Sequence, residues 1–456
     1  MSEIRHGLDL TDGRISTLLL RFSVPFMLAN IVYSLYGIVG MLVVGRYTNP
    51  ATIAAVATGS QIFNIMQAFM TGIGTGATVL LGRRIGERNN EAGTRSVGST
   101  FIVTAVMIVI ITLAIWVFRE ILLDLLGTQP ETRESATRYV KISTLGVPFN
   151  LGYAMLGAMF RGMGNSTAPS TVAGISCAVN IVLSFLLVGV TGMAEAGVAF
   201  AAVAAQMLSF VLLAVWLYRK RFPFPFSFKD FKPDKISTKA IVTVGFPIVM
   251  QDLALAAAFM VITNRVNSIS VEAAAAVGVV NRAINIAFVL PAAIGSAVAA
   301  MTAQNLGASK GDRAFSSLRW GIVYALVIDV SAFVVCMLWP EAVTAVFATD
   351  ESVITAAASY LKGYAFEAVM IALVFCMNSY LCGCGKSKIT MIHTTLSVFC
   401  FRVPLCIIIA QLQGLDLPAR LTFLGISGPV ASLFSVIVCV IYIHRLRKRS
   451  NGYQLA

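Results

Sequence analysis

The chain has few charged residues for its length. Asp, Glu, Lys and Arg make up 12% of its 456 residues, whereas 57% are hydrophobic and the mean hydropathy is +0.83. A soluble domain carries about 25% charged residues, so this chain lacks the polar side chains that a water-facing surface needs. We therefore expect an integral membrane protein, and its many apolar runs of about 18 or more residues predict a polytopic one.

Histidine and clustered cysteine are also scarce. The chain has three histidines, and most of its eight cysteines stand singly in apolar runs, where Cys behaves as a small hydrophobic residue. Cys382-Gly-Cys384 is the only cluster in the sequence, so no set of residues has the spacing of a metal site. We expect no metal and no cofactor. The net charge of +13 does not indicate a nucleic-acid partner, because the basic residues fall in short loops.

Twelve apolar segments can be drawn along the chain, and each can cross a hydrocarbon core of about 30 Å as a helix. Backbone polar groups in lipid must be satisfied within the segment, and these runs are too long for barrel strands, which predicts an all-α membrane protein. The polar start and the long first run argue against a cleavable signal peptide. The expected spans are 17–44, 52–80, 94–118, 136–160, 167–190, 194–218, 239–266, 273–300, 315–337, 352–382, 389–411 and 421–446.

Lys and Arg predict the orientation of these spans. They concentrate at the N-terminus and in the loops after the even-numbered spans, with clusters at Arg83–Arg95, 219–239 and Arg445–Arg449. By the positive-inside rule both termini are cytoplasmic. We expect a multi-pass protein of the cytoplasmic (inner) membrane, monomeric and surrounded by membrane lipid.

The second half of the chain repeats the first. Pro25 in Ser-Val-Pro-Phe matches Pro247 in Gly-Phe-Pro-Ile. Phe160-Arg-Gly-Met-Gly-Asn-Ser returns as Leu381-Cys-Gly-Cys-Gly-Lys-Ser at nearly the same separation. Such a Gly-x-Gly could bind phosphate, but the P-loop lysine pattern is missing, so a tight turn is favoured.

Six spans in each half predict two parallel six-helix repeats, because an even number returns the chain to the same side of the membrane. The expected domains are an N-lobe at 1–218, a basic cytoplasmic linker at 219–238 that lies at the membrane surface, and a C-lobe at 239–456. Two such bundles around a central cleft are typical of a transporter with alternating access.

Ionisable residues inside spans are costly and are candidates for function. From helix rise, Asp252 and Glu367 lie about 21 and 22 Å below the outer face, and Arg282 lies at about 14 Å. These three residues form our predicted cation-coupling site, because a carboxyl in low dielectric can load and release a proton near neutral pH. The alternative is a static Asp–Arg pair that locks two spans together, and Asp329 is the weaker candidate.

The N-terminal half has uncharged polar residues at mid-span instead. Asn150 and Asn180 fall near the midplane of consecutive spans, which favours a site, although each could simply bond between helices. Met and aromatic side chains suit an adaptable apolar cleft. The predicted polar cleft residues are Asn150, Asn180, Asn64, Gln61 and Gln251, and the predicted apolar ones are Tyr36, Met70 and Met260.

A family resemblance fits these features. The sequence resembles the MATE family of multidrug and toxic compound extrusion transporters, in its prokaryotic, DinF-like branch. The resemblance covers nearly the whole chain and implies an antiporter that exports small organic, often cationic, compounds in exchange for H⁺ or Na⁺. It rests on Asp12-Gly-Arg-Ile, Val24-Pro-Phe-Met-Leu-Ala-Asn, Val44-Gly-Arg-Tyr, Arg161-Gly-Met-Gly-Asn-Ser, Asn180-Ile-Val-Leu-Ser and Gln304-Asn-Leu-Gly-Ala.

The chain departs from the family pattern at two positions. The resemblance implies an acidic residue late in the first span, where this chain has Gly40, and an Asn-x-x-x-Asp in the fifth, where Asn180 is followed by Ser184. The usual N-lobe acids are therefore missing. We hypothesise that coupling runs through the C-lobe, by Asp252 and Glu367.

Two other functions are alternatives to an antiporter. A lipid-linked saccharide flippase of the same wider superfamily would need a basic central cavity for pyrophosphate, whereas mid-span cations are few beyond Arg282 and Arg402. An intramembrane transferase would need a paired-acid or His/Asp motif near an interface. The sequence shows neither, so the antiporter is preferred and an enzyme is not expected.

Overall fold

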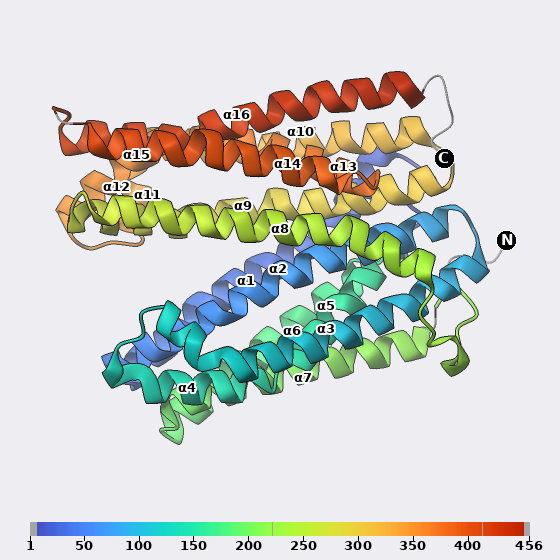
Figure 1. Cartoon of the computed structure of the whole chain (residues 1–456), viewed down its shortest axis with the longest axis horizontal. Helices are drawn as coiled ribbons and strands as arrows, with labels where there is room; N and C mark the ends of the chain where they lie inside the picture. Colours follow the sequence, from blue (N-terminus) through green and yellow to red (C-terminus); the bar gives the residue numbers. More distant parts are fainter. Residues whose placement is uncertain (1–6, 221, 413, 451–456) are drawn as a thin grey trace. The chain divides into compact units, whose positions relative to one another are not determined.

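The structure is a computed structural model that describes residues 7–220, 222–412 and 414–450, apart from the side chains of 33–42, 64, 228, 285, 286, 449 and 450. Every regular element in these ranges is a helix (Figure 1). The all-α fold predicted from composition and from the length of the apolar runs is therefore confirmed.

The first half of the chain, blue to green in Figure 1, consists of long helices with short turns between them. Asn49 caps the second helix, since its side chain accepts a hydrogen bond from the Thr52 N–H at 2.8 Å. The elements are α1 (Ile15–Tyr47), α2 (Pro50–Gly86), α3 (Asn90–Leu125), α4 (Pro130–Thr144), α5 (Val147–Gly162), α6 (Thr167–Ser184), the π-helical η1 (Phe185–Val190) and α7 (Ala194–Lys220).

The second half repeats this order. Ser270 caps α9 as Asn49 caps α2 at the corresponding point of the first half. The elements are η2 (Phe228–Asp230), α8 (Lys235–Asn267), α9 (Val271–Gly307), α10 (Gly311–Leu338), α11 (Pro340–Ala345), α12 (Glu351–Tyr364), α13 (Phe366–Gly383), α14 (Ser387–Ser397), η3 (Val398–Arg402), α15 (Val403–Gln411) and α16 (Leu417–Ser450).

Eleven helical segments of the described chain are long and apolar enough to cross a membrane. The expected span 136–160 is not among them because it is interrupted between α4 and α5. Pro148, in the first turn of α5, has no N–H with which to continue the hydrogen bonds of α4. Counted as one interrupted span, α4 and α5 complete the twelve that the sequence predicts.

The internal repeat is visible in the backbone itself. Gly164 and Gly385 both have positive φ, at 81° and 71°, which only glycine adopts readily. Arg88 and Ser309 also share a positive φ, at 53° and 59°, although neither is glycine. The Gly-x-Gly turns predicted from the sequence are thus confirmed as tight turns at the same point of both halves.

Contacts divide the chain into two compact units. The first consists of the segment up to Asp12 and of Arg21–Gly245, and the second of Gly13–Leu20 and the chain from Phe246 onward. We call the first unit the N-lobe and the second the C-lobe. In the N-lobe α2 packs on α5 and α6 on α7, and in the C-lobe their counterparts α9 and α13, and α14 and α16, pack in the same way.

The segment that the sequence predicts as a basic linker is anchored to α3 of the N-lobe. The Phe224 ring is buried and lies against Gly93, where a Cβ would come within 2.4 Å of it. The Ser99 hydroxyl accepts a hydrogen bond from the Asp234 N–H at 2.8 Å. An aromatic cluster of Phe101, Phe222, Phe226 and Phe231 covers the same end of α3.

Candidate functional site

Glu367 is the most deeply buried glutamate of the described C-lobe, with 2% of its surface exposed. It lies in the first turn of α13, and Ala365 alone separates this helix from the end of α12 at Tyr364. The first turn of a helix has backbone N–H groups without intrahelical partners, and these favour a negative charge. The break between α12 and α13 therefore provides a local reason for an acid at this point of an apolar span.

The Glu367 carboxylate has one hydrogen bond from a side chain. The Ser432 hydroxyl of α16 donates to Oε1 at 2.8 Å, while the buried Oε2 has no hydrogen-bond partner among the described residues. Gly428 lies beside this carboxylate, and a Cβ there would come within 3.0 Å of Tyr364 Cε2 and would make ordinary contact with Oε2 at 3.5 Å. A buried acceptor without a partner is free to bind a proton.

Glycines bring α12 and α16 close together beside this carboxylate. A Cβ on Gly363 would lie 2.0 Å from the Thr422 carbonyl oxygen, and one on Gly425 would lie 2.4 Å from the Tyr360 carbonyl oxygen. Small residues at a contact of membrane helices allow the backbones to approach. This close packing fixes the position of Ser432 relative to Glu367.

Arg402 is a buried cation whose charge acts on Glu367. It ends the π-helical η3, and its Nη2 donates to the Tyr364 hydroxyl at 3.1 Å. Its guanidinium carbon lies 4.7 Å from the centroid of the Phe259 ring, a cation–π distance. The charges of Arg402 and Glu367 interact without a direct ion pair in the described structure.

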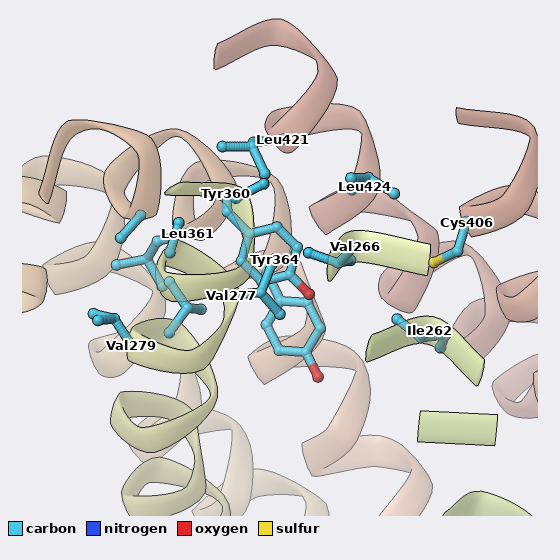
Figure 2. Packing of buried hydrophobic residues seen from close by; sticks show 14 of the residues in the cluster. Ile262, Val266, Val277, Val279, Tyr360, Leu361, Tyr364, Cys406, Leu421 and Leu424 are labelled. Carbon is cyan, nitrogen blue, oxygen red and sulfur yellow. The ribbon is translucent and has the colours of Figure 1, made fainter. Parts of the chain in front are cut away.

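An apolar cluster covers one side of this charged group. Tyr360 and Tyr364 stack with ring centroids 5.6 Å apart, and Figure 2 shows both hydroxyls pointing to the same side of the cluster. A wall of this kind excludes water and strengthens the interactions between the charges beside it. Its labelled members are Ile262, Val266, Val277, Val279, Tyr360, Leu361, Tyr364, Cys406, Leu421 and Leu424 (Figure 2).

Asp252, the other predicted coupling acid, has different neighbours. It is half-buried on α8, and its charge acts on the Cys382 thiol near the end of α13. Glu367 lies at the start of the same helix, so about 22 Å of helix separates it from the level of Cys382. Arg282 is exposed on α9, and the arginine that interacts with Glu367 is Arg402.

The predicted polar residues of the N-lobe are uncharged and partly paired. Asn180 is buried, and its Oδ1 accepts a hydrogen bond from the Ser184 hydroxyl at 3.1 Å. Asn150 is half-buried on α5, and Gln61 is exposed on α2. This arrangement holds no ionisable group, so it offers a polar surface rather than a titrating one.

The remaining predicted cleft residues have varied surroundings. Met70 is half-buried on α2, and Met260 is 66% exposed on α8. Gln251 is half-buried, and its Oε1 has no hydrogen-bond partner among the described residues. The side chains of Asn64 and Tyr36 lie outside the described residues.

A hollow of about 490 Å³ lies on the N-lobe between α3 and α4. Its lining is charged, and most of the charges pair with one another: Arg133 with Glu120 at 3.4 Å, and Arg138 with Glu134 at 3.1 Å. Paired charges at a surface do not make an apolar binding site, so this hollow is a poor candidate for organic ligands.

Sequence reasoning did not include Tyr364, Ser432 and Arg402 in the site. Arg402 could have been found as the single charge within the apolar run 389–411. The repeat carries a second signal, because the alignment of the two halves places Arg402 within one residue of the position that corresponds to Asn180. Ser432 carries no such signal, because serines are common in these spans and its role depends on packing between α13 and α16.

Comparison with known families finds the same duplication. The MatE family model matches residues 25–186 and, a second time, residues 247–408. The two matches begin at the helix prolines Pro25 and Pro247, which the repeat also pairs. Each lobe therefore carries one copy of the family's unit.

Individual proteins are similar over nearly the whole chain. The Bacillus subtilis "Probable multidrug resistance protein YoeA" is 24% identical over 428 residues, 92% of this chain and 91% of that protein. The Pseudomonas aeruginosa "Multidrug resistance protein PmpM" is 27% identical over 395 residues, 85% and 82% of the two chains. A solved "multidrug resistance MATE family transporter of the MOP superfamily" has a TM-score of 0.90 at 20% identity, covering 97% of this chain and 99% of its own.

Proposed function

The chain belongs to the MatE family, and from that premise we propose that it is a secondary active antiporter that exports organic, often cationic, compounds by alternating access. Its relatives are multidrug resistance proteins of bacteria, which supports small organic substrates and a multi-pass protein of the cytoplasmic membrane. The protein is a transporter and not an enzyme, in keeping with its family. Asn150, Asn180, Met70 and Met260 remain proposed contacts for the exported compound.

The observation that carries the coupling proposal is the buried Glu367 beside Arg402 and Ser432. We propose that the coupling ion is a proton and that Glu367 binds it. A metal cation such as Na⁺ would be repelled by the nearby guanidinium, whereas a proton neutralises the carboxylate by forming an O–H bond. The free Oε2 supplies the atom to which the proton binds.

The same group offers a way to link the proton to a change of conformation. Ionised Glu367 attracts the Arg402 guanidinium. This attraction competes with the contacts that the guanidinium makes with Tyr364 and Phe259. Protonated Glu367 loses that attraction and leaves Arg402 to its aromatic partners. A ligand can shift an equilibrium between two arrangements only by binding one of them more tightly, and the proton does so here.

Asp252 is the second carboxyl of the proposal. Its neighbours on α13 differ from those of Glu367, so the two acids act as separate groups. Asp252→Asn and Glu367→Gln are therefore made singly and together. Full proton-driven transport by the double variant would exclude coupling through these acids of the C-lobe.

Transport of a fluorescent cationic dye into or out of proteoliposomes tests the coupling ion. We expect an imposed pH gradient to drive dye exchange, and a Na⁺ gradient at equal pH to leave it unchanged. Glu367→Gln keeps the shape and removes the proton site, so the rate should fall at least about tenfold, equivalent to about 1.4 kcal/mol in the barrier. Dye exchange driven by Na⁺ alone would overturn the choice of the proton.

Glu351→Gln is the matched control. It makes the same chemical change in the first turn of α12, where Glu351 is exposed. Its transport should equal that of the wild type. A loss as large as that of Glu367→Gln would show that the assay responds to charge in general and not to this site.

The orientation also stays a proposal. We propose that both termini are cytoplasmic, because Lys and Arg concentrate in the loops on that side. A reporter fused to the C-terminus that is active only in the cytoplasm should be active. We further propose a monomer, which light scattering of the purified protein in detergent would check.

A flippase for lipid-linked saccharides is less well supported. Such a protein needs free cations to bind pyrophosphate. Arg402 is instead held by Tyr364 and Phe259, and its charge acts on Glu367.

A further inference from the structure

Asp329 is a second buried acid of the C-lobe, and the proton scheme above does not use it. It lies on α10 and has 0% of its surface exposed. Both of its carboxylate oxygens are buried without a hydrogen-bond partner among the described residues. An acid in such a place is unusual, because buried polar groups of native proteins nearly always have partners.

The face of α10 that carries Asp329 packs against α13. Phe333, one turn further along α10, packs on Phe366 of α13 with ring centroids 5.0 Å apart. Phe366 directly precedes Glu367, so Asp329 lies about 6 Å along the helix axis from the level of Glu367. Glu367 faces α16 through Ser432, so the two acids lie on different sides of α13.

The surroundings of Asp329 provide no charge that could pair with it among the described residues. The thiol of Cys376 on α13 is the titratable group that interacts with it electrostatically. Lys362 of α12 is paired with Glu341 of α11 at 3.5 Å. The helices packed on α10 are α9, α11, α12 and α13, and their titratable residues are Glu272, Arg282, Glu341, Glu351, Tyr360, Lys362, Tyr364, Glu367, Cys376, Tyr380 and Cys382.

An ionised carboxylate without a partner in low dielectric is so costly that the group takes up a proton instead. Asp329 is therefore neutral in the packed arrangement of α10 and α13. Ionisation becomes possible only when water reaches the carboxyl, which requires α10 and α13 to separate at Phe333 and Phe366. Binding and release of the proton are then tied to the packing of these two helices.

We propose that Asp329 is a further proton-binding site of the C-lobe, beside Glu367 and Asp252, loaded when α10 is packed on α13 and emptied when the two helices part. In the release step the O–H bond of the carboxyl breaks, and the proton passes to water and leaves a carboxylate. This inference rests on the proposed function, because it assumes that protons drive export. It adds that the exporter moves a proton on each side of α13.

Infrared difference spectroscopy of the reconstituted protein detects protonation of this site independently of transport. A pH jump on the wild type should change the carboxylic-acid C=O bands of both Asp329 and Glu367. Asp329→Asn should remove one band and leave the other, and Glu367→Gln should do the reverse. Asp312→Asn, the same change at an exposed position on the first turn of α10, should keep both.

Stoichiometry provides the transport measurement. With the membrane potential clamped at zero, the limiting dye gradient depends on the number of protons exchanged. Loss of one proton should lower that gradient about tenfold for each unit of pH difference, since one pH unit is worth about 1.36 kcal/mol per proton. Asp329→Asn should show this fall, while Asp312→Asn should match the wild type.

The outcomes separate the two proposals. If Asp329→Asn keeps the wild-type bands and gradient, Asp329 is a permanently neutral structural acid and this further site is overturned, while Glu367 is unaffected. If Glu367→Gln transports fully, the proposed coupling fails, whatever Asp329 does. Asp329→Glu keeps the acid and serves if Asp329→Asn is poorly folded. It should retain a C=O band that changes with the pH jump, and absence of this band would count against the site.

Discussion

The two lobes carry different chemistry at the same place in the repeat. When the halves are aligned, Asn180 of the N-lobe and Arg402 of the C-lobe fall within one residue of each other. Asn180 accepts a hydrogen bond from Ser184, and the pair is neutral. Arg402 is charged, donates to Tyr364 and acts on Glu367. One fold thus holds a polar pair in one copy and a buried charge group in the other.

The backbone conformation is the same at matching turns of the two lobes, although the side-chain chemistry of the two lobes differs. The positive φ of Arg88 and Ser309, of Gly164 and Gly385, and of Gly192 and Gly414 recurs at nearly constant offset. Turn geometry is required for both copies to fold, whereas a titrating group is required only once per transport cycle. The difference agrees with the proposal that proton coupling runs through the C-lobe.

Arg402→Leu should have the largest effect on this comparison. Removing the arginine leaves the buried Glu367 without a compensating charge, which costs at most about 3–5 kcal/mol, the range for breaking a direct buried pair, since Glu367 can take up a proton. Thermal unfolding in detergent measures the loss. Asn180→Leu in the N-lobe breaks a single neutral hydrogen bond and should cost about 1 kcal/mol.

The double variant Arg402→Leu, Glu367→Gln is the control for charge. It removes both buried charges, so most of the stability lost in Arg402→Leu should return. If the double variant is as unstable as the single one, the loss comes from the packing of the arginine on Phe259 and Tyr364, and the electrostatic contrast between the lobes is wrong.

Gly363→Ala should have the next largest effect. A Cβ there would lie 2.0 Å from the Thr422 carbonyl oxygen, so α12 and α16 must move apart, and overpacking of this kind costs about 1–3 kcal/mol. Transport should fall as well, because Ser432 on α16 would shift from Glu367. The melting temperature and the dye-exchange rate report the two effects.

Gly278→Ala is the matched control in the same lobe. It lies in α9 with open space around the added Cβ. Alanine favours a helix over glycine by about 1 kcal/mol, so this variant should be as stable as the wild type or more stable. A loss equal to that of Gly363→Ala would contradict the role of close packing.

Most of the fold follows from the sequence, because apolar length, loop charge and an internal repeat are local signals. The twelve spans and the turns at Gly164 and Gly385 were predictable in this way. The anchoring of Phe224 against Gly93 was not, since it joins residues far apart in the chain and depends on the shape of α3. Prolines and basic residues marked that segment as a linker but did not indicate what it contacts.

The site was predictable only in part. Glu367 stood out as an acid in an apolar span, but its partners on η3, α16 and α12 depend on which helix faces pack together. Counting residues from the outer end of each helix placed Asp252 and Arg282 near Glu367. This count assumes upright helices that begin at one level, whereas the charge of Asp252 acts on Cys382 at the other end of α13. The structure surrounds Glu367 with Ser432 and Arg402 instead.

Ser184→Ala tests, in the N-lobe, the contrast between the neutral pair of that lobe and the charged group of the C-lobe. It removes the hydroxyl that donates to Asn180, so stability should fall by about 1 kcal/mol or less. Because the pair is neutral, the dependence of dye exchange on pH should stay that of the wild type. A shifted pH profile in this variant would mean that the N-lobe also takes part in proton coupling.

The smallest effect is expected at Asp234, which precedes α8 and corresponds in the repeat to Asp12 before α1. Its carboxylate accepts a hydrogen bond from the Ser237 N–H at 2.8 Å, and bonds from Ser237 hold the pKa of Asp234 below its ordinary 3.8. A lowered folded pKa means that this contribution is complete above about pH 4 and is lost as the pH falls through the folded pKa.

Asp234→Asn keeps a capping side chain without the titration. The wild type should therefore be slightly more stable than this variant at pH 6, and the difference should shrink below about pH 4. Thermal unfolding of the two proteins between pH 3 and pH 6 measures it. A difference that grows on acidification would have the wrong sign for a carboxylate stabilised in the folded state. It would also argue against a stabilising role of the Asp234 carboxylate as a cap of α8.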